Sequence, residues 1–140
     1  MEILLVEDDL DDAKDTIDVL NRGNVRCRVS LVRDGEEARR FLHREGVFAR
    51  TPRPDLVLLD VQLPKRDGHQ FLSEMRADED LDKIPVLVLS GSAIYKSLFE
   101  GEGLHVDAFF AKPLEPEPFV RLVKTLHYSL LTELVASATA

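Results

Sequence analysis

Apolar positions along the chain follow two patterns, and the first predicts strands. Three segments of four residues are apolar without interruption, at 3–6, 56–59 and 86–89. Uninterrupted runs of Val, Leu and Ile are typical of strands buried on both faces, because a half-exposed strand would alternate with polar residues. Weaker candidates at 27–32 and 108–111 bring the number of predicted strands to five.

The second pattern has apolar residues three and four positions apart, which is the period of an amphipathic helix. The first segment of this kind predicts a buried face made of Leu10, Ala13, Ile17 and Leu20. The sequence Asn-Arg-Gly-Asn at 21–24 predicts the end of that helix. The same period predicts four more helices, which are centred on 35–44, 71–75, 93–100 and 118–134.

The predicted elements alternate between strand and helix along the chain. This alternation favours a parallel sheet, because parallel neighbours need a crossover connection and a helix usually provides it. We therefore expect an α/β fold, a doubly wound five-stranded parallel sheet with five helices. Residues 45–54 are expected to form a longer loop, and the small residues 136–140 to fray.

Composition favours one folded domain with an acidic surface. The 140 residues are 44% hydrophobic, which supplies a core for a domain of this length. The formal charge of −8 argues against a nucleic-acid binder, which needs a basic face. The single cysteine, Cys27, excludes an internal disulfide and suits a reducing compartment. Without a signal peptide or an apolar run near the roughly 18 residues of a membrane span, we expect a cytoplasmic protein.

Charged and polar residues follow the predicted strands, where ligands bind in doubly wound sheets. The residues in these positions are Glu7, Asp8 and Asp9 after the first strand, Asp60 after the third, Ser90 after the fourth and Lys112 after the fifth. Clustered carboxylates repel one another unless cations neutralise them, and Mg²⁺ prefers such oxygen ligands. A central carboxylate could attack a phosphoryl group, because phosphoryl transfer needs mainly in-line placement and charge neutralisation.

Four motifs lie at these strand ends: ILLVEDD at 3–9, DLVLLDVQLPKRDG at 55–68, VLVLSGS at 86–92 and AFFAKP at 108–113. With them the chain resembles a response-regulator receiver domain of bacterial two-component signalling. The resemblance covers residues 2–131 and implies the flavodoxin-like receiver fold. It implies one receiver domain over 1–140, with a tail at 132–140 and no output domain.

The resemblance implies how the chemistry is divided among the acidic residues. Asp60 corresponds to the aspartate that accepts the phosphoryl group. Glu7 and Asp8 correspond to the acidic pair that holds Mg²⁺, with Asp8 as the expected direct ligand and Glu7 acting through water. Gln62 stands where the family uses a backbone carbonyl as a metal ligand.

The resemblance also implies a switch. Ser90 corresponds to the switch hydroxyl, Phe109 to the aromatic switch residue, and Lys112 to the lysine that precedes a cis-proline, here Pro113. Ser and Phe replace the commoner Thr and Tyr, so the hydroxyl is retained but the phenol is lost. His and Val at 105–106 replace the usual Gly-Ala, which affects the face around the fourth helix.

Residues 32–60, with their extended loop, are similar to stand-alone regulators that accompany bacterial phytochromes. The function implied is a switch: a sensor histidine kinase, of the phytochrome type, phosphorylates Asp60 with Mg²⁺ present, and the new conformation alters protein contacts or relays phosphate. Such a domain catalyses only its own phosphotransfer and dephosphorylation. The apolar surplus on 118–134 favours a homodimer through the fourth helix, fifth strand and fifth helix, although a monomer stays open.

Two rival functions are weighed against this one. A Mg²⁺-dependent phosphohydrolase would resemble enzymes that carry a second acid two residues after the nucleophile, where this chain has Gln62. A structural module that no longer accepts phosphate is the other rival, and Asp8, Asp60 and Lys112 argue against it. A nucleotide-binding protein fits poorly, because no Gly-rich loop follows the first strand.

Overall fold

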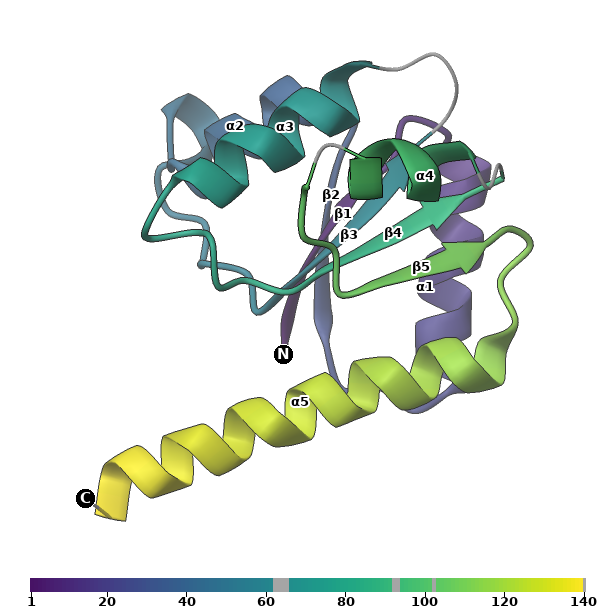
Figure 1. Ribbon diagram of the computed structural model, residues 1–140. Helices are drawn as coiled ribbons and strands as arrows, with labels where there is room; N and C mark the ends of the chain where they lie inside the picture. The colour runs from purple at the N-terminus through teal and green to yellow at the C-terminus, as the bar shows by residue number, and fades with distance from the viewer. Residues whose placement is uncertain (62–65, 92–93, 102, 140) are drawn as a thin grey trace.

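The computed structural model describes residues 1–61, 66–91, 94–101 and 103–139. It is an α/β fold with one five-stranded sheet between two layers of helices (Figure 1). The elements in chain order are β1 (Glu2–Val6), α1 (Leu10–Arg22), β2 (Arg28–Val32), α2 (Gly35–Leu42), a 3₁₀ turn (Gly46–Phe48), β3 (Leu56–Val61), α3 (Arg66–Ala77), β4 (Val86–Ser90), α4 (Ile94–Gly101), β5 (Ala108–Ala111) and α5 (Pro116–Thr139). Within the described ranges, no helix has both the length and the apolar character that a bilayer crossing requires.

The sheet is parallel throughout, in the order β2-β1-β3-β4-β5. This confirms the predicted doubly wound α/β fold. The three uninterrupted apolar runs form the three central strands, and their residues are at most 4% exposed. Strand order reverses between β1 and β3, so the carboxyl ends of these two strands flank the crevice where this class of fold binds ligands.

The sheet separates two hydrophobic layers. Helices α2, α3 and α4 cover one face, and α1 and α5 cover the other (Figure 1). Neighbouring residues of one strand point to opposite faces, so Phe109 packs against the α2–α3–α4 layer and Phe110 against the α1–α5 layer. A rearrangement of Phe109 therefore acts on one layer directly and on the other only through the backbone.

Two local expectations need correction. Leu10, assigned to the buried face of the first helix, is 69% exposed, because it is the first helical residue and the buried stripe begins one turn later at Ala13. Residues 136–139 continue α5 as far as Thr139 where fraying was expected, and the Ala and Leu residues near this end favour helix. The longer loop expected at 45–54 is present between α2 and β3, and it contains the 3₁₀ turn.

A largely buried arginine connects segments at the amino-terminal edge of the sheet. Arg76, near the end of α3, donates hydrogen bonds to the carbonyls of Asp82 at 2.7 Å, His105 at 2.9 Å and Ile84 at 3.0 Å. Its Nη2 lies 3.6 Å from Asp107 Oδ2. Burial lowers the pKa of the guanidinium, and the Asp107 and Asp82 carboxylates act in the opposite direction. Arg76 thus joins α3 to the segments that lead into β4 and β5.

Candidate functional site

The candidate site lies beyond the carboxyl ends of β1, β3, β4 and β5. Strand register brings these ends level, since Val61 pairs with Ser90 and Ser90 pairs with Ala111. The backbone N–H of Lys112 donates to the carbonyl of Ser90 at 2.9 Å, which extends the β4–β5 pairing by one residue. The backbone N–H of Glu7 donates to Val32 at 2.9 Å in the same way. Residues far apart in sequence therefore meet at one edge.

Lys112 is at the centre of a group of carboxylates. Its Nζ lies 3.3 Å from Glu7 Oε2 and 3.1 Å from Asp12 Oδ2, and it forms an ion pair with Asp60 Oδ2. The side chains of Glu7 and Asp60 are each 1% exposed, whereas that of Asp12 is 37% exposed. Two of the three carboxylates are thus buried, and a buried charge without a compensating partner is costly.

The donor set fits a hard divalent cation. Among the described residues, one group of acidic side chains could hold a metal ion, with carboxylate oxygens within 4.8 Å of one another: Glu7, Asp12 and Asp60. Three carboxylates against one ammonium leave a formal excess of two negative charges. Oxygen ligands and this charge suit Mg²⁺ or a similar ion.

Asp12 was not among the residues selected from the sequence, although Asp8 was. Asp8 directly follows Glu7 and is exposed, and it does not belong to the group of three. Its role as a metal ligand stays a prediction. Gln62, the other predicted ligand, lies outside the described residues.

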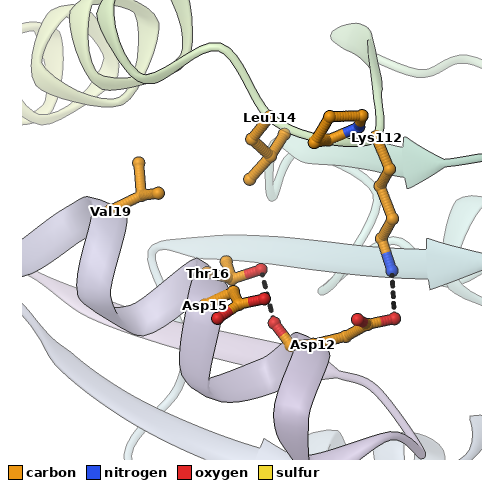
Figure 2. A pocket seen from close by; sticks show the side chains of 7 residues that line it. Asp12, Asp15, Thr16, Val19, Lys112 and Leu114 are labelled. Atoms are coloured by element: carbon orange, nitrogen blue, oxygen red, sulfur yellow. Dashed lines mark hydrogen bonds and ion pairs between the residues drawn. The ribbon is translucent and has the colours of Figure 1, made fainter.

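Local hydrogen bonds explain why Asp12 lies beside Lys112. Asp9 caps α1 and accepts hydrogen bonds from the backbone N–H groups of Asp11 at 2.9 Å and Asp12 at 3.1 Å. In a capping box, the third helical residue would return a bond to the N–H of the cap. Here Glu7 Oε1 accepts from that N–H at 2.9 Å. The Asp12 carboxylate instead points at Lys112 (Figure 2).

The predicted switch residues lie on neighbouring strands. Ser90, at the end of β4, is 7% exposed. Phe109 is half-buried, and its ring centroid lies 6.1 Å from that of Phe99 in α4. The ring of Phe99 also stacks on His69 of α3, at 5.8 Å. The Lys112–Pro113 peptide bond is cis.

In a comparison with known protein families, residues 3–124 match the family described as the response regulator receiver domain. The chain belongs to the response regulator receiver family. Response regulator Rcp1 of Synechocystis sp. is 35% identical over 122 residues, which cover 87% of this chain and 83% of the relative. A solved structure of Rcp1, titled as the Mn(2+)-bound form, aligns with a TM-score of 0.72 at 34% identity, covering 89% of this chain and 90% of that one.

Two other solved structures connect this receiver to phytochrome signalling proteins. The bacteriophytochrome response regulator RtBRR aligns with a TM-score of 0.80 at 37% identity, over 89% of this chain and 76% of that one. The phosphorylated cyanobacterial phytochrome response regulator RcpA aligns with a TM-score of 0.73 at 39% identity, over 89% of each chain. The chain is therefore a phosphoryl-accepting receiver domain related to phytochrome response regulators, and receiver domains have histidine kinases as partners.

Proposed function

We propose that this receiver accepts a phosphoryl group on Asp60 from a sensor histidine kinase of the bacterial phytochrome type. The observation that supports it best is the convergence of Asp60, Glu7 and Lys112 at the carboxyl ends of β3, β1 and β5. Asp60 is the buried carboxylate on β3, next to the point where strand order reverses. The phosphorylated relative RcpA supports the same chemistry.

Mg²⁺ is the proposed cofactor. Glu7 and Asp60 would hold it, together with Asp8 and the backbone carbonyl of Gln62. The bound ion supplies positive charge that neutralises the phosphoryl oxygens. The oxygen donor set and the Mn(2+)-bound form of Rcp1 support a divalent ion.

Side chains of the receiver carry out the phosphoryl transfer and stabilise the transferred group. An oxygen of the Asp60 carboxylate forms a bond to phosphorus while the bond from phosphorus to the kinase imidazole nitrogen breaks, and that nitrogen keeps the electron pair. The Lys112 ammonium donates hydrogen bonds to one phosphoryl oxygen. The Ser90 hydroxyl donates a hydrogen bond to another. This receiver thus catalyses its own phosphorylation and dephosphorylation and needs no separate substrate site.

Output is proposed to follow from the movement of two residues. When Ser90 turns toward the acyl phosphate, Phe109 fills the space that it leaves. The face formed by α4, β5 and α5 then changes its contacts, either in a homodimer or with a phosphorelay partner. The ring contact between Phe109 and Phe99 supports this route, because it joins β5 to α4. We place these events in the cytoplasm, where a lone thiol such as Cys27 stays reduced.

Intact-mass measurement tests the acceptor. The protein is incubated with acetyl phosphate and either Mg²⁺ or EDTA, and the variants Asp60→Asn and Asp80→Asn are treated alike. Asp80 is an exposed carboxylate in the turn after α3, so it controls for the loss of one charge. We expect a gain of one phosphoryl group in the wild type and Asp80→Asn, only with Mg²⁺, and no gain in Asp60→Asn. Uptake by Asp60→Asn at the wild-type rate and stoichiometry would show that the acceptor is another residue. Size-exclusion chromatography of both forms tests the dimer.

A further inference from the structure

The carboxylate of Asp12 differs from the other two that surround Lys112. Asp12 belongs to the first turn of α1, whereas Glu7 and Asp60 belong to the strand ends. Its side chain is 37% exposed, against 1% for each of the others, so it faces the solvent side of the cluster. Its Oδ2 lies 3.1 Å from Lys112 Nζ, slightly closer than Glu7 Oε2, which lies 3.3 Å from the same nitrogen.

The surroundings of this contact leave room for the ammonium to move. A cavity of about 420 Å³ lies between α1 and the segment after β5, and Asp12, Lys112 and Leu114 line it. Figure 2 shows the Lys112 side chain extending along this opening toward Asp12, with Val19 farther along the same helix. Lys112 Nζ contacts Asp12 and Asp60 at the same time, so a small movement of the flexible lysine side chain can shift the ammonium toward either carboxylate without repacking the core.

We propose that Asp12 is a positioning residue that holds the Lys112 ammonium on the α1 side of the site and competes for it with a phosphoryl group on Asp60. This inference rests on the proposed function. It predicts that Asp12 strengthens the binding of a divalent cation and weakens the binding of a phosphoryl group. The residue would thereby favour the unphosphorylated form of this receiver.

The two opposite effects follow from charge. Without Asp12, the excess of two negative charges at the cluster falls to one, so a divalent cation is attracted less strongly. A phosphoryl group brings further negative charge, which Asp12 repels. Lys112 has three N–H donors, and those that pair with Asp12 are not available to phosphoryl oxygens. Removing Asp12 therefore helps the anion and hinders the cation.

A merely structural role for Asp12 would give a different result. An acidic residue in the first turn stabilises the helix through its dipole, and Asp11 does so equally. Asp11 is exposed and lies in the same turn, so Asp11→Asn removes the same charge from the same helix end. If Asp12 only supported α1, then Asp12→Asn would behave as Asp11→Asn does, or would weaken the binding of both ions together.

The experiment measures two affinities in four proteins: wild type, Asp12→Asn, Asp12→Glu and Asp11→Asn. Isothermal titration gives the Mg²⁺ affinity, and titration with beryllofluoride at saturating Mg²⁺ gives the affinity for a phosphoryl analogue. For Asp12→Asn we expect Mg²⁺ binding about threefold weaker and beryllofluoride binding about threefold tighter, as suits one partly exposed charge pair. Asp12→Glu keeps the charge and restores the Mg²⁺ affinity, and Asp11→Asn leaves both affinities near the wild type.

Equal changes in Asp12→Asn and Asp11→Asn, or a loss of both affinities in Asp12→Asn, would overturn the positioning role. Asp12→Ser serves as a second variant if the asparagine variant is poorly folded, because Ser is well tolerated at a helix N-terminus. The two proposals fail differently. A wild type that binds neither Mg²⁺ nor beryllofluoride contradicts the proposed function itself. A wild type that binds both, with Asp12 variants that match it, contradicts the positioning role alone.

Discussion

Replacing Lys112 by Met removes the cation that compensates the buried carboxylates. The change keeps a side chain of similar length and takes away one charge. Glu7 and Asp60 are each 1% exposed, so both would stay buried with no ammonium beside them. Breaking a buried ion pair by removing one partner costs roughly 3–5 kcal/mol. Because the Lys112 side chain is itself 19% exposed, we expect a loss near the lower limit, about 3 kcal/mol of unfolding free energy.

A divalent cation should reverse part of this loss, because it supplies the missing positive charge. If the vacated position tightens Mg²⁺ binding about tenfold, saturating Mg²⁺ stabilises Lys112→Met by about 1.4 kcal/mol more than it stabilises the wild type. Urea unfolding followed by circular dichroism, with Mg²⁺ or with EDTA, measures both quantities. Lys83→Met is the matched control, because Lys83 is exposed and precedes β4 at the opposite edge of the sheet.

Two results would refute this reasoning. Lys112→Met could be as stable as Lys83→Met in EDTA, which would mean that the carboxylates do not depend on the ammonium. Alternatively, Mg²⁺ could stabilise the wild type and Lys112→Met by the same amount. That result would mean that the ion and the ammonium do not compensate the same carboxylates.

Two further predictions concern the scaffold. Arg76→Met should lower the unfolding free energy by about 2–4 kcal/mol, because it deprives three backbone carbonyls of a charged donor. Arg53→Met, which removes an exposed arginine with one such bond, should change it by less than about 0.5 kcal/mol, and urea midpoints that coincide would contradict this account. Gly23→Ala should cost about 1–3 kcal/mol, since a Cβ there would lie 2.6 Å from Val120 Cγ2, between α1 and α5. Adding Val120→Ala should recover part of that loss in thermal unfolding, and a purely additive double variant would argue against the clash.

The sheet and its site-bearing edge could be predicted from the sequence for a simple reason. Uninterrupted apolar runs of Val, Leu and Ile are typical of strands buried on both faces, and the residues that follow parallel strands lie at one edge of the sheet. Asp60 and Lys112 could therefore be placed together from the sequence. The long α5 was also predictable from its apolar period, although its last residues were wrongly expected to fray.

Residues whose roles depend on a particular hydrogen bond could not be predicted in this way. Asp12 looks like an ordinary acidic residue in a first helical turn, and the bond from the Asp9 N–H to Glu7 leaves its carboxylate able to turn to Lys112. A pattern that could have indicated it is an acidic residue three positions after an Asp cap that itself follows a buried strand. Arg76 is a comparable case, because its three carbonyl acceptors are separated from it by 6, 8 and 29 residues.

The division of the core by the sheet has a consequence for how such a protein can change over generations. Phe109 and Phe110 are neighbours in sequence but belong to different layers. A substitution among the side chains of one layer leaves the packing of the other intact, so the two halves can accumulate mutations independently. One half can be remodelled for a new binding task while the half that contains Phe109 keeps its inherited packing.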